Sequence, residues 1–177
     1  MKKILMLGAI MIVAVGCSNS KNLNINSKDN LVIENINSDK RDLEDIIIFN
    51  QDGVTIRREG KNLILSMEEH ILFDIDKSIV KEGVKTHLDT LSKALFENRD
   101  LRIKIDGYTC NLGSENYNLK LSLNRAKSIK EYLVENKVPS NSITVEGYGE
   151  SDPIENNASE VNRSQNRRVE FIISRAY

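Results

Sequence analysis

Alternating apolar and polar positions predict three strands in the second half of the chain, at residues 101–107, 143–147 and 167–174. In the first of these, the odd positions up to 105 are leucine or isoleucine, and the even positions are charged. Successive side chains of a strand point to opposite faces, so this pattern indicates a half-buried strand with one wet face.

The last of these strands predicts where two consecutive arginines point. Arg167 has the parity of the apolar side chains, whereas Arg168 and Glu170 take the other side. The apolar positions are Val169, Phe171 and Ile173. Arg167 is therefore expected on the helix-covered face of the sheet.

Helical spacing of apolar residues predicts two amphipathic helices. The first runs to about residue 98, with Ser78 as its N-cap. Its stripe consists of Val80, Val84, Leu88, Leu91 and Leu95. The second begins after Ser114, has Glu115 in its first turn and ends near residue 136. Its buried face is expected to consist of Leu119, Leu123, Ala126, Ile129 and Leu133.

Three polar residues line one edge of that second helix. Asn118, Ser122 and Arg125 lie at positions i, i+4 and i+7, which bring side chains to the same side of a helix. An arginine at the border of a core, next to a polar loop, requires a partner.

The region before the first helix predicts a β-hairpin. Residues 54–57 and 63–67 flank a turn at 59–62, and residues 46–49 form a further short strand. The hairpin leads directly into the strand that opens the domain.

That opening strand is expected to span residues 63–73, with Glu68 and Glu69 interrupting it as a bulge. Together with a short helical turn at 162–166, the order of elements becomes β-α-β-α-β-turn-β. We therefore predict an α/β fold, a two-layer sandwich with helices on one face of a mixed sheet.

The chain begins with two lysines and an apolar run at residues 4–15. Such a run is too short to span a bilayer but suits the core of a signal peptide. It ends in Ala14-Val15-Gly16-Cys17, which resembles the lipobox of bacterial lipoproteins. That resemblance implies removal of residues 1–16 and a lipid on the thiol of Cys17. The alternative is an ordinary cleaved signal with an incidental cysteine.

Residues 17–45 are predicted to form the lipidated N-terminus and a flexible tether. They are rich in Asn, Ser, Lys and Asp and show no sustained apolar period. The hairpin lead-in at 46–62 and the domain at 63–177 follow. Ser18 stands directly after the cysteine; in lipoprotein families where an aspartate there gives inner-membrane retention, this implies export to the outer membrane.

Composition narrows the functional classes. A net charge of -1 and 5% aromatic residues argue against a nucleic-acid partner. His70 and His87 stand alone and no CxxC pair is present, so no structural zinc site is expected. No order of serine, histidine and aspartate typical of a hydrolase is visible. We predict neither catalysis nor a cofactor.

The loop at 107–114, with the sequence GYTCNLGS, is the candidate ligand site. It is small, polar and glycine-containing, and it joins a strand to a helix. At such turns, backbone N–H groups and side chains can converge on a ligand.

Four motifs give the chain a family resemblance. They are ILFDIDKS at 71–78, DGYTCNLGS at 106–114, YNLKLSLNRA at 117–126 and NRRVEF at 166–171. They resemble FD-x-(D/N)-K-S, EGHTD-N-x-GS, YN-x-x-LS-x-x-RA and NRRVEF of OmpA C-terminal-like domains, the family of the peptidoglycan-associated lipoproteins. The resemblance covers about residues 63–174, including the turn at 147–153.

The resemblance implies non-covalent binding of the peptide stem of peptidoglycan, with a diaminopimelate or similar diamino acid in a pocket formed by the loop and the helix. In the family, the aspartate of HTD binds an ammonium and the arginine of RA binds a carboxylate. Carried over by position, the ligand-binding residues are Asp76, Thr109, Cys110, Asn118, Arg125 and Arg167.

Cys110 departs from this pattern because it stands where the family has the aspartate; Tyr108 similarly replaces the histidine. A charge-assisted hydrogen bond contributes about 1.5–3 kcal/mol, so its loss weakens affinity on the order of 10- to 150-fold. Another carboxylate could substitute. Asp76 and Glu115 are better candidates than Asp106, whose strand parity is wrong.

The function implied is that of an outer-membrane lipoprotein that anchors the membrane to the cell wall, with its domain facing the periplasm. The expected partners are peptidoglycan, the outer-membrane lipid through acylated Cys17, and other envelope proteins. The alternative is a protein-interaction module on the same fold, with peptidoglycan binding weakened or lost because Cys110 replaces the usual aspartate.

Overall fold

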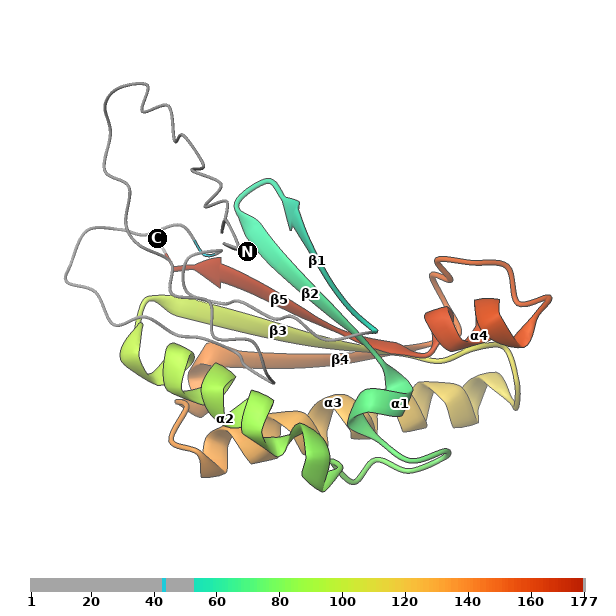
Figure 1. The fold of residues 1–177 in the computed structure, drawn as a ribbon, viewed down its shortest axis with the longest axis horizontal. Helices are drawn as coiled ribbons and strands as arrows, with labels where there is room; N and C mark the ends of the chain where they lie inside the picture. The colour runs from blue at the N-terminus through green and yellow to red at the C-terminus, as the bar shows by residue number, and fades with distance from the viewer. Residues whose placement is uncertain (1–42, 44–52, 177) are drawn as a thin grey trace, which may run out of the picture.

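The computed structural model describes Leu43 and residues 53–176 (Figure 1). In this part of the chain, five strands form one sheet in the order β1-β2-β5-β3-β4. The strands are β1 (Val54–Glu59), β2 (Asn62–Glu68), β3 (Leu101–Tyr108), β4 (Ile143–Gly149) and β5 (Arg168–Arg175). The helices are α1 (Glu69–Leu72), α2 (Glu82–Glu97), α3 (Glu115–Glu135) and α4 (Glu160–Asn166), with a 3₁₀ turn η2 (Ser140–Ser142).

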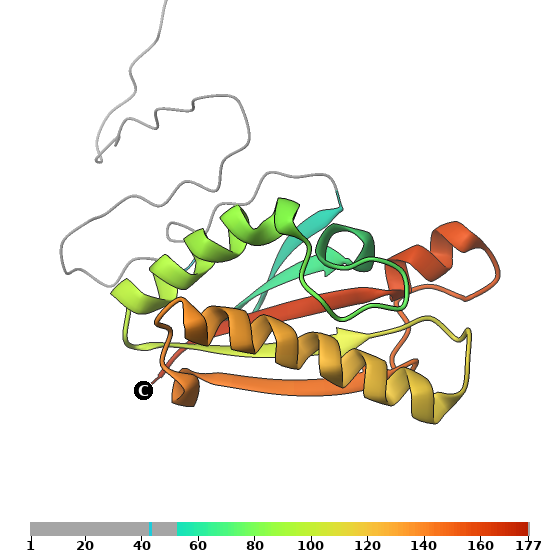
Figure 2. The same ribbon diagram turned by 90° about the horizontal axis from the view of Figure 1, so that it is seen from below.

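The sheet is mixed, as predicted. The pairing is antiparallel between β1 and β2, between β2 and β5, and between β5 and β3. It is parallel between β3 and β4, which the crossover helix α3 connects. Figures 1 and 2 show α2 and α3 on the same face of the sheet, with α4 beyond its end. The two-layer α/β sandwich and the β1–β2 hairpin are thus confirmed. The predicted signal peptide, Cys17 and the strand at 46–49 lie outside the described residues.

The core lies between the sheet and the two long helices. The inward-facing strand residues are Leu63, Leu65, Met67, Leu101, Ile103, Ile105, Val169, Phe171 and Ile173, all at most 2% exposed. Val84, Leu88, Leu91 and Leu95 of α2 face them, as their helical spacing predicted. Full burial of such a side chain contributes about 1.5–3 kcal/mol, so the alternating pattern determines which face of each strand is covered.

The predicted strand at 63–73 is wrong in its second half. β2 ends at Glu68, and Glu69 begins the single helical turn α1 in place of a bulge. The physical reason is three consecutive buried residues, Ile71, Leu72 and Phe73. A strand would turn one of them to the opposite face, whereas leaving the strand allows all three to reach the core.

The predicted N-cap at Ser78 is also wrong. α2 begins at Glu82, its N-cap is Lys81, and no side chain caps it. The backbone N–H of Lys81 donates to the carbonyl of Leu72 at 2.9 Å, which closes a loop between the end of α1 and the start of α2. Residues 73–81 consequently form a loop, although Val80 still packs against the core.

The sheet face away from the helices is less exposed to solvent than its polar residues predicted. Asp106, Arg168 and Glu170 are only 5%, 3% and 6% exposed. The Arg168 guanidinium lies 3.8 Å from the Tyr108 ring centroid, and its Nε is 2.9 Å from Glu170 Oε1. Burial opposes ionisation of Glu170, but hydrogen bonds from Arg57 and Arg168 outweigh it and lower the pKa. Long side chains on neighbouring strands thus cover one another.

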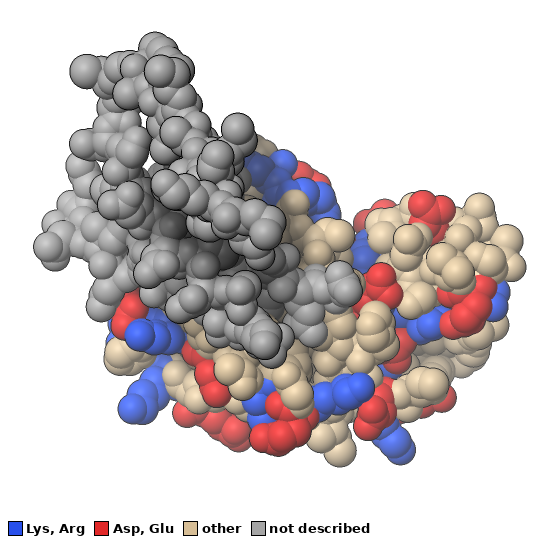
Figure 3. Space-filling model, viewed as in Figure 1, with Lys and Arg blue, Asp and Glu red and all other residues tan. Residues whose placement is uncertain are grey.

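On the visible molecular surface, acidic and basic side chains are interspersed rather than separated into large fields (Figure 3). Among the described residues, no helix combines the length and the apolar character needed to cross a membrane.

Candidate functional site

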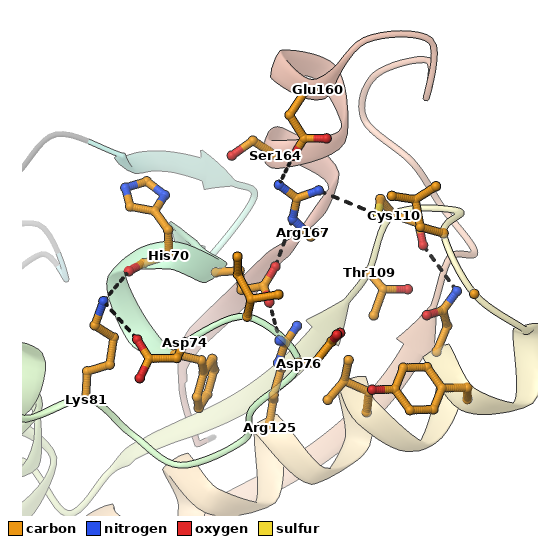
Figure 4. Close-up of a pocket in the computed structure, with 18 residues that line it drawn as sticks. His70, Asp74, Asp76, Lys81, Thr109, Cys110, Arg125, Glu160, Ser164 and Arg167 are labelled. Carbon is orange, nitrogen blue, oxygen red and sulfur yellow. Dashed lines mark hydrogen bonds and ion pairs between the residues drawn. The ribbon is translucent and has the colours of Figure 1, made fainter.

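A cavity of about 600 Å³ lies where α1, the loop after it, the β3–α3 loop, the start of α3 and the α4–β5 junction meet (Figure 4). Its lining includes all six residues that the sequence predicted: Asp76, Thr109, Cys110, Asn118, Arg125 and Arg167. The fold therefore brings together side chains from four separate segments of the chain.

The β3–α3 loop is held at both ends. The Thr109 N–H donates to the carbonyl of Gly149 at 2.7 Å, which ties the loop to the end of β4. At the other end, Ser114 Oγ accepts from the Tyr117 N–H at 3.3 Å, so Ser114 caps α3 as predicted. Gly113 just before it has φ of 101°, a conformation that favours glycine.

Asn118 holds this loop from within the helix. Its side chain is buried, and Nδ2 donates to the Cys110 carbonyl at 3.2 Å and to Glu150 Oε2 at 2.7 Å. Both donor hydrogens of the amide are therefore accounted for. Asn118 lines the cavity, but these contacts make it a positioning residue for Cys110.

Helix α3 rests directly on the backbone of the sheet. A Cβ added to Gly107 would lie 2.3 Å from the Ser122 carbonyl oxygen, and one added to Gly147 would lie 2.4 Å from the Leu123 nitrogen. Gly107 and Gly147 are paired across β3 and β4, so they form a flat seat for the helix.

This seat explains why the predicted buried face of α3 is wrong at its beginning. Leu119 is 46% exposed and Leu123 is only partly buried. The inward-facing side chains here are instead Asn118, Ser122 and Arg125, each at most 2% exposed. Ala126, Ile129 and Leu133 are buried as expected.

The carboxylate of Glu69 lies between the two arginines of the cavity. Its Oε1 accepts a hydrogen bond from Arg125 Nη2, and its Oε2 lies 2.8 Å from Arg167 Nε. Glu69 is 8% exposed and Arg125 is 2% exposed. Charged groups this deeply buried are tolerated because they are paired and hydrogen-bonded.

Arg125 has two further contacts that fix its guanidinium. Its Nε donates to the Lys77 carbonyl at 2.9 Å, and its Cζ lies 5.4 Å from the Phe73 ring centroid. The loop after α1 is therefore joined to α3 through this one side chain. The partner that its sequence position required is Glu69.

Arg167 lies just before β5 and not within it as predicted, but it still lines the cavity on the helix-covered side, where three groups surround its side chain. Besides Glu69, Nη2 lies 2.5 Å from Glu160 Oε1, and Nη1 donates to Cys110 Sγ at 3.6 Å. Burial disfavours its charge, but hydrogen bonds to Cys110 and Glu160 and the nearby negative charges outweigh this and raise its pKa.

Two members of the predicted set, Thr109 and Asp76, retain polar atoms that a ligand in the cavity could contact. Thr109 is 5% exposed, and its Oγ1 has no hydrogen-bond partner among the described residues. Buried hydroxyl groups are normally bonded, so an unpaired one inside a cavity suggests a ligand contact. Asp76 is exposed at the cavity rim with φ of 55°.

Glu69 is the site residue that the sequence analysis missed. The local pattern at Glu69 predicts only an interruption of a strand, because its partners come from distant parts of the chain. Of the three substitute carboxylates considered, Asp76 lines the cavity, Glu115 does not, and Asp106 lies on the opposite sheet face, 3.0 Å from Lys104. The cavity lining thus favours Asp76 over Glu115 as the substitute, and Asp106 lies on the face that its strand parity indicated.

Comparison with known proteins assigns the chain to a family. A profile of the OmpA family matches residues 72–167. Outer membrane porin F of Pseudomonas fluorescens is 37% identical over 107 residues, which cover 60% of this chain but only 33% of porin F. Outer-membrane lipoprotein YfiB of Pseudomonas aeruginosa is 32% identical over 130 residues, covering 73% of this chain and 76% of YfiB.

A solved structure has a similar fold. The peptidoglycan-associated lipoprotein of Burkholderia pseudomallei matches with a TM-score of 0.56 at 25% identity, covering 59% of this chain and 88% of that protein. The likeness in three dimensions thus agrees with the sequence matches.

Proposed function

The chain belongs to the OmpA family, and from this premise we propose that it binds the peptide stem of peptidoglycan non-covalently. A lipid on Cys17 would hold the chain in the outer membrane, so that the protein ties that membrane to the cell wall from the periplasmic side. The function is one of attachment, without catalysis and without a cofactor.

The observation that supports this proposal best is the convergence of Arg125, Arg167 and Thr109 on one cavity. A peptidoglycan stem carries carboxylates and, at its diamino acid, an ammonium group. Guanidinium groups bind carboxylates through parallel hydrogen bonds, and the unpaired Thr109 hydroxyl can donate or accept.

Apolar side chains around the cavity suit the aliphatic parts of such a ligand. Ile75, Leu112 and Tyr117 line it and are 85%, 59% and 47% exposed. Apolar walls with a few fixed polar groups are typical of binding sites for small molecules and peptide ends.

The names of two similar proteins support the cellular setting. YfiB is described as an outer-membrane lipoprotein, and the Burkholderia structure as a peptidoglycan-associated lipoprotein. The lipobox-like sequence that ends in Cys17 agrees with both descriptions. Cys17 and most of the tether lie outside the described residues, so anchoring is part of the proposal.

Co-sedimentation with purified sacculi tests the proposal, using the full-length protein in detergent. We expect wild type in the pellet and Arg125→Ala weakened at least about tenfold, since a hydrogen bond to a charged group is lost. Arg125→Lys, which keeps the charge but not the planar fork, should also bind more weakly. Arg102→Ala is the matched control because Arg102 is exposed and does not line the cavity.

Thermal melts of each variant separate lost binding from lost folding. Folded wild-type protein that stays in the supernatant would refute the peptidoglycan proposal.

One observation favours the alternative of a protein-interaction module. Both arginines already contact Glu69, and the side chain of Cys110 stands where the resemblance places a carboxylate. Under this alternative, sacculi do not bind the protein, and crosslinking in intact cells instead captures an envelope protein at the cavity rim through a crosslinker placed at Tyr117.

A further inference from the structure

The side chains that line the cavity carry more negative than positive charge. The acidic residues are Glu69, Asp74, Asp76 and Glu160, and the basic residues are Lys81, Arg125 and Arg167. Each basic group already contacts an acid: Lys81 Nζ lies 3.5 Å from Asp74 Oδ1, and the arginines contact Glu69 and Glu160. The lining thus holds one carboxylate more than it holds lysine and arginine groups, and a cationic group of the ligand would balance it.

Glu69 is the most rigidly held of these acids. Two guanidinium groups fix its two oxygens, and its backbone N–H donates to the Arg167 carbonyl at 2.8 Å. A carboxylate offers about four acceptor positions, two per oxygen, so each oxygen retains capacity beyond its arginine contact. Such a fixed group binds a donor without first having to become ordered.

A second observation independently indicates a ligand in the same cavity. Thr109 is 95% buried by the exposure given above, and its hydroxyl has no partner among the described residues. Its oxygen can accept one hydrogen of an ammonium group, which has three donors to satisfy.

We propose that Glu69 binds the ammonium group of the ligand's diamino acid, the role that the family resemblance gives to an aspartate at position 110. This inference rests on the proposed function. Glu69 and Cys110 flank the same guanidinium, with Oε2 2.8 Å from Arg167 Nε and Sγ 3.6 Å from Arg167 Nη1. The carboxylate thus reaches this arginine from α1 instead of from the β3–α3 loop.

Two ligands that differ in one charge test the proposal by titration calorimetry of the full-length protein in detergent. One is a stem tripeptide ending in diaminopimelate, and the other is the same peptide with its side-chain amine acetylated. Wild type should prefer the free amine by about 10- to 150-fold, the range for one charge-assisted hydrogen bond. Glu69→Gln should bind the free amine more weakly and lose this preference.

Two further variants make the assignment specific. Glu68→Gln removes the same charge from the neighbouring residue, which does not line the cavity, and should retain the wild-type preference. Glu69→Gln with Cys110→Asp should regain a preference for the free amine, because a carboxylate is again beside Arg167.

The outcomes separate this inference from the proposed function. If wild type binds neither peptide nor sacculi, the proposed function fails and the inference fails with it. If wild type binds and Glu69→Gln keeps both affinity and preference, or binds more tightly, only the inference is overturned. Glu69 would then serve only as the internal ion-pair partner of Arg125 and Arg167.

Carbon-13 NMR of the wild-type protein covers the case in which Glu69→Gln does not fold. The Glu69 carboxyl signal should move with the free-amine peptide and stay unchanged with the acetylated one. Equal movement with both peptides would contradict the assignment.

Discussion

Replacing Gly107 by alanine should disturb both the stability and the binding site of this protein. The new Cβ would lie 2.3 Å from the Ser122 carbonyl oxygen, whereas ordinary contacts begin at 3.4 Å, so α3 or β3 must move by about 1 Å. The opposing atom belongs to the helix backbone and cannot rotate away. The change therefore tests whether α3 is truly seated on the sheet.

The magnitude follows from two opposing effects. Overpacking of a well-packed interior costs about 1–3 kcal/mol, and a rigid backbone neighbour puts this case at the upper end. Loss of glycine's freedom in the unfolded chain offsets about 0.4–1 kcal/mol. We expect a net destabilisation of about 2 kcal/mol, which lowers the urea midpoint by about 1 M.

The site should change together with the stability. Arg125 follows Ser122 by one helical turn and contacts Glu69 and the Lys77 carbonyl. A shift of α3 moves these contacts, so sacculus binding should weaken under conditions where the variant is still folded.

Gly83→Ala is the matched control. Gly83 lies in the first turn of α2, and an added Cβ would meet nothing within 4 Å. Alanine is favoured over glycine in helices by about 0.5–1 kcal/mol, so this variant should be at least as stable as wild type. If Gly107→Ala kept the wild-type urea midpoint and binding, the reasoning about the seat would be refuted.

Two further predictions concern buried polar groups. Thr109→Val should keep or raise the stability, because an unpaired buried hydroxyl costs about 1–3 kcal/mol. The same change should weaken stem-peptide binding. Urea melts and calorimetry measure the two effects, and lost stability with unchanged binding would contradict the prediction. Burial raises the pKa of Asp106 above its ordinary value of 3.8, although Lys104 opposes the shift. The folded protein therefore binds this proton more tightly than the unfolded chain does, and its stability falls as the pH rises through the two pKa values. Asp106→Asn should therefore gain stability relative to wild type in urea melts as the pH rises above 3.8, and a constant or shrinking difference would be the contrary result.

Local sequence was sufficient for most of the fold because burial follows the period of each element. In α2, the stripe from Val84 to Leu95 is buried as its spacing predicted, although the N-cap was wrong. In β3, Leu101 and Ile105 alternate with charged residues and face the core. Periodicity reports which side of an element is covered, and it does so whatever lies opposite.

Contacts between distant segments were beyond the same reasoning. Glu69 pairs with Arg125, 56 positions later, and the sequence around Glu69 gives no sign of this. Glu170 likewise contacts Arg57, which lies 113 positions away in the chain. The alternation of polar residues predicted a solvent-exposed face there, but these charged side chains form a buried network. The identity of the partner, not the local pattern, decides whether such a charge can be buried.

The glycines show a third kind of information. Gly107 belongs to a motif, but its close contact with Ser122 depends on the crossover that places α3 over β3 and β4. A glycine in a strand suggests close approach of another backbone, without saying which one. The direction of Leu119 and Leu123 followed from that contact and could not be predicted from helical spacing.

The identities of residues 69 and 110 depend on each other through Arg167. Its guanidinium already contacts the carboxylates of Glu69 and Glu160, and Cys110 Sγ lies 3.6 Å from Nη1. An aspartate at 110 would bring a third carboxylate to one cation, and like charges that close disfavour each other's ionised form.

A cysteine brings no further carboxylate to this arginine, so Cys110 fits a cavity whose carboxylate comes from α1. The effects of Glu69→Gln and Cys110→Asp on ligand affinity should therefore be non-additive, with Cys110→Asp helping more when residue 69 is glutamine. Strictly additive effects would show that the two positions act independently, and that the cysteine does not compensate for the glutamate.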